Sequence, residues 1–554
     1  MIIRNHFVAS VGVMLITSAI AGAQTPATKS DDQARMNGLV QQAVERFNEN
    51  VQASARQNAA QTPSQSVAVV GAVSVPLSLE DAVRRATENN LDIQVERLNP
   101  QTFDLSIAGL QAVYHPTATS RYGRTDNVRL PTSLLNPGSP NISTMTYNAG
   151  VTQAMRWGGG SLTTSFNNQR QASSDVFSNF NPQFNSSLNF NYTQPLLRNF
   201  RIDSTRQAIK TTMISRDTAD LNLKARTTNT LAAVRSAYWD YVYAIQAVDV
   251  ARQSLTLAQK LLSDNRIRVD IGTMAPMDVV QARAEEATRQ QAVTTATATM
   301  RTAELSLKRL IVSGTNDPLW AQHIEPTDRP DFQAVTVDVE SAVRAALQQR
   351  TDLQVARNNM ASNNVVLKSL NDQKLPAVDL TTSYGGSGLG GTSFTFAGSG
   401  LDRVKTGEIP GSYTDALSSL FDRKYPNWTM QVNVSYPIGG SAAEANAART
   451  KLLISQNEAQ IRASELTVAT EVTNAALQVQ NNVEGLAAAR AARELSQQRL
   501  DAESSRFEVG MSTNYQVVQA QRDLRDAQNS ELRALLNYRK SLVEFDRVQQ
   551  AGAR

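Results

Sequence analysis

The chain has 554 residues, enough for several ordinary domains or for one long repetitive one. Its 54 lysines and arginines nearly balance its 50 aspartates and glutamates, and a net charge of +4 gives no reason to expect a nucleic-acid partner. There is no cysteine, and the three histidines are His6, His115 and His323, none of which has another within metal-ligand spacing. We therefore predict no enzyme site, no metal site and no cofactor.

The N-terminus reads as an export signal over residues 1–23. Arg4 supplies the positive charge, residues 7–20 the apolar stretch, and residues 21–23 an Ala-x-Ala cleavage site. A buried N-terminal helix is the alternative, and the cleavage site argues against it. No cysteine follows the apolar run, so no lipid anchor is expected. Residues 24–75, rich in Gln, Ala, Ser and Asn, predict a flexible extension.

No later segment has the 18 or more consecutive apolar residues of a membrane-spanning helix. An exported chain with neither a lipid anchor nor such a helix is periplasmic, secreted, or a β-barrel of the outer membrane.

Two tandem copies of one pattern make up the rest of the sequence. Residues 77–99 align without gaps to residues 337–359, and residues 268–282 align to residues 506–520. The second match places an Arg-x-x-x-Gly turn before Val-Val-Gln-Ala in both copies. Matches in the same order indicate a duplication. The predicted units are a first repeat at 77–313, a linker or equatorial segment at 314–336, and a second repeat at 337–550.

Each repeat is expected to open with a helix of roughly 30 residues that ends at Pro116 or Pro376. Strand-like sequence follows, over about residues 117–195 and 377–437.

A long helical stretch comes next in each repeat. Residues 200–267 contain neither proline nor glycine and would span about 100 Å as one helix. The second repeat has the same pattern over residues 442–507, interrupted only by Gly485. Apolar residues step by three, four or seven, as in coiled coils. A plain coiled-coil dimer or bundle would show this spacing too. The seam of the first long helix consists of Val234, Tyr238, Tyr241, Ile245, Val248, Leu255, Ala258 and Leu262.

The strand-like segments alternate between apolar and polar residues. Residues 428–436 alternate most strictly, and a strand that spans a membrane shows this pattern, with one face toward lipid and one toward the lumen. A half-buried strand of a soluble sheet has the same period. Residues 147–157 and 162–169 form a further alternating pair around Gly158-Gly159-Gly160, which predicts an extra hairpin. The predicted lipid-facing residues are Trp428, Met430, Val432, Val434 and Tyr436.

With these motifs the chain resembles the outer membrane efflux protein family of TolC-like channels over about residues 77–550. The resemblance is carried by the duplicated Arg-x-x-x-Gly turn, by Gln-Pro-Leu-Leu at 194–197, and by the paired repeat starts at 77–83 and 337–343. It implies an α+β membrane protein in which duplicated hairpins of long helices form a periplasmic α-barrel. It also implies a transmembrane β-barrel shared by three subunits, each contributing four strands.

The same resemblance implies the function and the partners. It predicts a passive outer-membrane duct for efflux or type I secretion, extending into the periplasm of a Gram-negative-type cell. The implied partners are two further copies of the chain, outer-membrane lipid, a periplasmic adaptor protein and an inner-membrane pump. The alternative is a structural exported trimer, a coiled-coil stalk or adhesin. A stalk would have a single terminal barrel segment, whereas strand-like sequence recurs here in both halves.

The two glycine turns are candidate contacts for the adaptor. The resemblance places them at the periplasmic tips, and glycine permits the positive φ at which a helix ends. Acidic residues nearby are candidates for rings of negative charge at the entrance under three-fold symmetry. Their alternative role is to line a solvated helix face. The predicted docking residues are Arg268, Gly272, Thr273, Arg506, Gly510 and Met511, and the entrance charges are Asp270, Asp278 and Glu508.

Overall fold

The computed structural model of the chain describes residues 74–128, 141–174, 178–329, 332, 335–398 and 404–550. The predicted signal peptide, and the predicted extension up to residue 73, lie outside the described residues. Among the residues that the structure describes, no helix is both long and apolar enough to cross a membrane.

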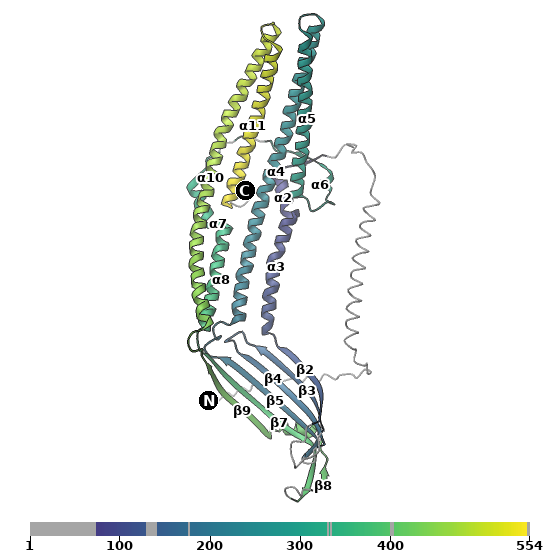
Figure 1. Ribbon diagram of the computed structural model, residues 1–554, viewed down its shortest axis with the longest axis vertical. Helices are drawn as coiled ribbons and strands as arrows, with labels where there is room; N and C mark the ends of the chain where they lie inside the picture. The colour runs from purple at the N-terminus through teal and green to yellow at the C-terminus, as the bar shows by residue number, and fades with distance from the viewer. Residues whose placement is uncertain are drawn as a thin grey trace, which may run out of the picture. The chain divides into compact units, whose positions relative to one another are not determined.

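Two long helical hairpins repeat the same dimensions (Figure 1). The outgoing helices both have 67 residues and the returning helices both have 36. The two predicted long helices are confirmed, each with ends within four residues of those expected. Among the seam residues, Val234, Tyr238 and Tyr241 are completely buried. The bounds are α4 Ser204–Asp270, α5 Pro276–Ile311, α10 Ala442–Glu508 and α11 Asn514–Gln549.

The prediction of a single helix at the start of each repeat is wrong, because this segment forms two helices in both repeats. The first break is at Asn90, whose backbone is extended (φ −64°, ψ 121°) and whose side chain caps the next helix by accepting from the backbone N–H of Asp92 and Ile93. The aligned position of the second repeat, Arg350, has almost the same backbone angles. The pieces are α2 Leu79–Asn89, α3 Leu91–Gln111 with the 3-10 turn Ala112–Tyr114, α7 Val339–Gln349 and α8 Thr351–Gln373.

Both breaks lie where a short helix meets the end of a returning helix. The Asn90 side chain donates to the carbonyl oxygen of Leu310, near the end of α5, at 2.9 Å. In the second repeat, the backbone N–H of Thr351 donates to the side chain of Gln550, just beyond α11, at 2.8 Å. Thus α3 continues the line of α5, and α8 that of α11, beside the uninterrupted α4 and α10 (Figure 1).

The segment between the repeats contains α6 (Pro318–Ala321) and β6 (His323–Pro326), and β6 pairs in parallel with β1 (Ser74–Leu77). Two buried tyrosines of α4 hold this pair against the helices. The Tyr238 hydroxyl bonds to the carbonyl oxygen of Leu77 and to the carboxylate of Asp328, and Tyr241 donates to the carbonyl oxygen of Ile324 at 2.6 Å. Burial raises the pKa of both phenols, so they stay neutral donors.

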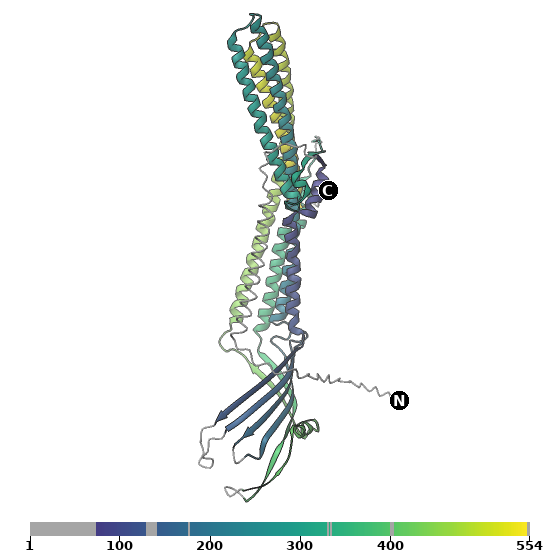
Figure 2. The ribbon, with the colours of Figure 1, turned by 90° about the vertical axis from the view of Figure 1, so that its right-hand side faces the viewer.

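A second, larger sheet lies at the end of the helical layer away from the glycine turns (Figures 1 and 2). Its order is β2-β3-β4-β5-β7-β8, with β9 also on β7, and every neighbouring pair is antiparallel. The predicted extra hairpin is confirmed as β3 and β4. The strands are β2 Thr117–Val128, β3 Asn141–Ala154, β4 Ser161–Ser173, β5 Phe180–Pro195, β7 Ala377–Ala397, β8 Val404–Ile409 and β9 Tyr425–Ser435.

The resemblance implies four strands per chain and the extra hairpin left their number open; this sheet has six strand positions among the described residues. The β3–β4 hairpin adds two positions to the first repeat. In the second repeat, β8 and β9 share one position: β8 pairs with residues 393–397 of β7, and β9 with residues 377–387. The helix α9 (Tyr413–Phe421) lies between β8 and β9 in sequence, so one strand position is interrupted by a helix.

Candidate channel wall and helical tips

One face of the large sheet, here called the amide face, carries Asn, Gln, Ser and Thr side chains on every strand from β2 to β9. The register aligns them in rows: Asn148 of β3 and Asn167 of β4 lie on the same face as Asn185 and Ser187 of β5. In the described part of β2–β5, of β7 up to residue 389 and of β9, the charged residues of this face are Arg121 and Asp379.

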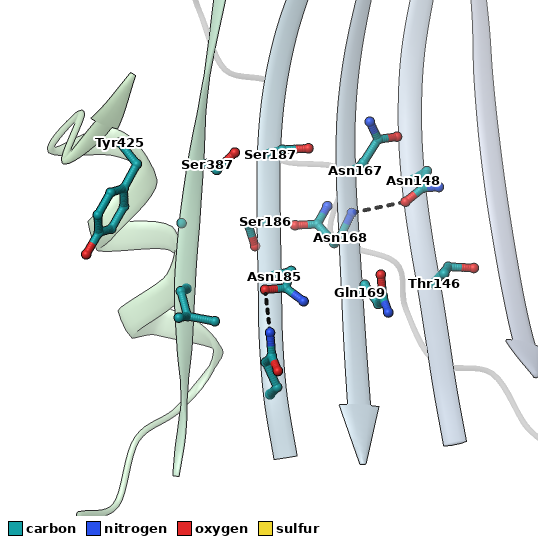
Figure 3. A pocket seen from close by; sticks show the side chains of 13 residues that line it. Thr146, Asn148, Asn167, Asn168, Gln169, Asn185, Ser186, Ser187, Ser387 and Tyr425 are labelled. Carbon is teal, nitrogen blue, oxygen red and sulfur yellow. Dashed lines mark hydrogen bonds between the residues drawn. The ribbon is translucent and has the colours of Figure 1, made fainter. Parts of the chain in front are cut away.

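The amide face is hollow where these rows meet. A concavity of about 740 Å³ is lined by side chains from β3, β4, β5 and β7, and by Tyr425 at the start of β9 (Figure 3). Amides on one strand bond to each other along it, as Gln183 does to Asn185 at 3.1 Å and Gln169 to Gln171 at 3.2 Å. A concave, neutral, hydrogen-bonding surface is suited to remain in contact with water.

The opposite face, here called the apolar face, carries the predicted lipid-facing residues of β9. The register places Trp428 opposite Tyr384, Met430 opposite Thr382 and Val432 opposite Leu380. The row continues on β5 with Phe190 and Leu188. Trp428, Met430, Val432 and Val434 are 76%, 61%, 55% and 67% exposed, and Tyr436, 60% exposed, lies one residue beyond the strand. An exposed apolar surface of this extent marks a contact with a membrane or another protein.

Both outer strands of this sheet have an unpaired edge. Among the described strands β2 pairs only with β3 and β9 only with β7, and the two strands have 12 and 11 residues. Each edge leaves a row of backbone N–H and C=O groups without strand partners among the described residues. Such edges cannot remain unpaired in lipid, so this sheet is complete only when its edges meet other strands.

The two glycine turns have the same geometry at the far ends of the hairpins. Gly272 has φ +79° and Gly510 has φ +77°, in the left-handed region that favours glycine. The N–H after each glycine donates to the carbonyl oxygen of the arginine five residues earlier, Thr273 to Arg268 and Met511 to Arg506, both at 2.8 Å. This bond ends each long helix in a Schellman motif and explains the glycine of the duplicated Arg-x-x-x-Gly pattern, whereas the acceptor is a backbone oxygen that any residue could supply in place of arginine.

The predicted docking residues are mostly exposed. Gly272, Thr273 and Gly510 are exposed, Met511 is 78% exposed, and a β-carbon added at either glycine would meet no neighbouring atom within 4 Å.

The two arginines differ. Arg506 is exposed and pairs with Glu503 at 3.7 Å. Arg268 instead lies over the Phe507 ring and donates to the Phe507 carbonyl oxygen at 3.2 Å, in the other hairpin. The Arg268 side chain therefore contacts the other hairpin of the same chain, unlike that of Arg506.

Polar contacts join the two hairpins near their tips, and sequence reasoning missed them. The buried Asn265 of α4 donates to Asn514 of α11 at 2.9 Å. Arg522 of α11 donates to Glu285 of α5 at 2.6 Å, and this hydrogen bond raises the pKa of the Arg522 guanidinium. Glu285 is only 5% exposed and also pairs with Arg289 one turn further on. A periodicity argument finds the apolar seam but cannot pair polar residues from two different helices.

Replacing Arg522 with glutamine (Arg522→Gln) should loosen the contact between the hairpins. The buried Glu285 would retain Arg289 but lose its partner across the hairpins. Because Arg522 is itself 46% exposed, we expect a loss of about 1 kcal/mol per chain in the free energy of unfolding. Denaturant unfolding of the detergent-solubilised protein measures this loss in the free energy of unfolding. Arg499→Gln, which removes an exposed pair with Asp523 within one hairpin, is the matched control and should change stability less. Equal effects would show that the contact is an ordinary surface pair.

The predicted entrance charges also lie at the tips. Asp270 and Glu508 are the last residues of α4 and α10 and are exposed, and Asp278 is half-buried in the first turn of α5. None of the three forms an ion pair within the part of the chain that the structure describes. Their role at an entrance remains a prediction.

The open antiparallel sheet, continued by long helical hairpins, is a fold shared with solved outer-membrane channels. Solved structures support this fold. The outer-membrane channel OprN has a TM-score of 0.60 at 15% identity, over 86% of this chain and 90% of that one. CmeC of Campylobacter jejuni, an outer membrane channel, has a TM-score of 0.58 at 13% identity, over 86% and 87% of the two chains.

The open state of the Neisseria gonorrhoeae MtrE outer membrane channel gives a TM-score of 0.57 at 16% identity, over 85% of this chain and 88% of that one. The family model of the outer membrane efflux proteins matches residues 142–312 and 342–548. The chain belongs to the outer membrane efflux protein family. No curated protein sequence matches the chain.

Proposed function

We propose that three copies of this chain form a passive duct through the outer membrane, in which the large sheets close into one β-barrel and the hairpins form a periplasmic α-barrel. The observation that carries the proposal is the sheet itself: its amide face suits a water-filled lumen, its apolar face suits lipid, and its two unpaired edges have matching lengths. β2 of one copy would pair with β9 of the next.

The six strand positions set the size of the proposed barrel. Three times six positions make eighteen strands, rather than the twelve that four per chain would make. Barrels of about 16 to 18 strands leave an aqueous channel, whereas about 8 strands enclose only side chains. Because the amide face carries little charge, the barrel portion should discriminate weakly between cations and anions.

The proposed duct exports small molecules or proteins that an inner-membrane pump delivers through a periplasmic adaptor. The tips at Gly272 and Gly510 are the proposed adaptor contacts, supported by their exposure and by the open space around both glycines. Repeated three-fold, Asp270, Asp278 and Glu508 would place negative charge at the periplasmic entrance and favour cations there.

Planar-bilayer recording of the purified protein tests the duct. We expect a mass of three chains in detergent and stable, ohmic channels. The conductance is compared with that of a twelve-stranded channel, with the periplasmic end of both channels open. A larger conductance for this protein would support the wider barrel. Trimers that never conduct would favour the structural stalk or adhesin instead. A stable monomer extracted without detergent would contradict the membrane barrel.

A further inference from the structure

The helix α9 covers part of the apolar face, on the side opposite the amide face. Gly388 is in register with Ser186, and a β-carbon at Gly388 would overlap the carbonyl oxygen of Ala416 in α9. Tyr413, the first residue of α9, donates to the Asn168 side chain at 2.8 Å. Ser186 and Asn168 are polar members of the apolar face, and the Tyr413 ring also contacts two aromatic members of it, Tyr147 and Phe184. In Figure 2 it is the short green helix beside the strands.

The position of α9 marks the end of the apolar band furthest from the long helices. The band runs along β9 from Val434 to Trp428, and α9 lies just beyond it, against Gly386, Gly388 and Gly390 of β7. The outward residues of α9, Thr414, Asp415 and Ser418, are polar and exposed. This is the pattern of a surface helix that packs its apolar side on the sheet and exposes its polar side.

A groove of about 290 Å³ opens between the C-terminal end of α9 and the apolar band. Phe190, Tyr384 and Phe421 line it and are 41%, 48% and 66% exposed, so the groove has an accessible apolar wall. Leu188 and the buried Leu420 complete this wall. Its apolar lining is suited to contact with a hydrocarbon chain.

Arg423 stands at the end of this groove and is part of its lining. It occupies the left-handed region, with φ +55°, where glycine is the usual residue after a helix. The turn is held by the Arg423 N–H on the carbonyl oxygen of Leu420, at 3.1 Å. Arg423 is exposed and forms no ion pair among the described residues, while the adjacent Lys424, 58% exposed, is 3.8 Å from Asp422. Arg423 is therefore a cation in the lining of an apolar groove, and Lys424 is the next residue of the chain.

We propose that this groove binds a phosphorylated lipid of the outer leaflet, with one acyl chain against Phe190, Tyr384 and Phe421 and the phosphate against Arg423 and Lys424. The proposal rests on the membrane insertion proposed above and adds a specific lipid site to it. Arg423 supplies charge-assisted hydrogen bonds to the phosphate, and the groove removes the acyl chain from the bulk bilayer. The bound lipid lies beside the C-terminal end of α9, in contact with Phe421 and Arg423.

Native mass spectrometry of the detergent-purified assembly tests the site. The probes are bis-phosphorylated lipid A and the same lipid A with its phosphates removed. We expect up to one retained lipid per chain and about tenfold tighter binding of the phosphorylated form. Arg423→Gln/Lys424→Gln should abolish this preference while retaining weak binding of the dephosphorylated lipid. Lys405→Gln, which removes an exposed lysine of β8 outside the groove, is the matched control and should bind both lipids as the parent chain does.

A second variant tests the apolar wall without risk to the fold. Phe421 is largely exposed, so Phe421→Ser should leave the assembly intact and weaken both lipids about equally. Equal binding of the two lipids by the parent chain, or unchanged binding in both variants, would overturn the site. The same spectra report the number of chains: loss of the three-chain assembly would count against the proposed duct, whereas an intact trimer without lipid preference would count against the groove alone.

Discussion

Little membrane-inserted trimer is expected from the Val432→Arg variant. Val432 lies in the middle of β9, opposite Leu380 on the apolar face, and is 55% exposed. In the proposed barrel this position is near the bilayer midplane, where an arginine costs about 2–4 kcal/mol per chain. Three copies incur that cost in one assembly. The amount of heat-resistant trimer in isolated outer membranes, compared by immunoblot at equal expression, measures the effect.

Asn433→Arg is the control for this prediction. Asn433 is the next residue of the same strand and points to the amide face, opposite Asp379. A charge there faces the lumen and lies near an existing carboxylate, so trimer yield should stay close to that of the parent chain. Similar yields of the two variants would mean that the faces of β9 are assigned wrongly.

The Gly272→Val/Gly510→Val double variant should form inserted trimers that no longer export. Both glycines have positive φ, which a β-branched residue tolerates poorly, so each Schellman turn is strained. A β-carbon meets open space at both sites, so the added side chains project from the tips into the volume proposed for the adaptor. The sheet lies at the opposite end of helices that are about 100 Å long, too far to be disturbed. Adaptor co-purification and substrate efflux, each normalised to trimer abundance, are the measurements.

Gly485→Val provides the same substitution away from the tips. Gly485 is an exposed residue within α10 and has open space around it. It should keep full adaptor binding and efflux, with helix stability unchanged or slightly raised, because valine disfavours an exposed helix position no more than glycine does. If the double variant also kept full adaptor binding and full efflux, the tips would have no part in adaptor docking.

Much of the helical architecture could be predicted because long-range periodicity and the duplication report the same elements. The seam containing Val234, Tyr238 and Tyr241 is buried as its spacing predicts, and the turns at Gly272 and Gly510 end the long helices. Strand alternation was equally informative: β3, β4 and β9 each include a predicted alternating run, and β5 and β7 lie in the segments predicted to form strands. These features are encoded in residues close together in sequence, where side-chain pattern and backbone geometry are directly linked.

Features that depend on distant parts of the chain were not predictable in this way. Asn90 and Arg350 interrupt helical sequence because returning helices end beside them, a contact that no local pattern contains. Arg268 was expected at an adaptor surface, and its side chain lies on Phe507, which is 239 residues away. The position of α9 likewise depends on a distant part of the chain, because the glycines of β7 allow the α9 backbone to approach the strand closely. The alternation of polar and apolar residues along the strands followed from sequence, and the number of strand positions did not.

The unpaired edges of β2 and β9 have a kinetic consequence. A single chain cannot satisfy its sheet, so if three copies close the barrel, folding of the sheet and assembly are one event that requires several chains to meet. Until then, each exported chain carries two open templates for strand addition, which also promote aggregation. The yield of finished channel should rise more steeply than in proportion to the concentration of exported chain, and dilute chains should depend on a holding chaperone to remain assembly-competent.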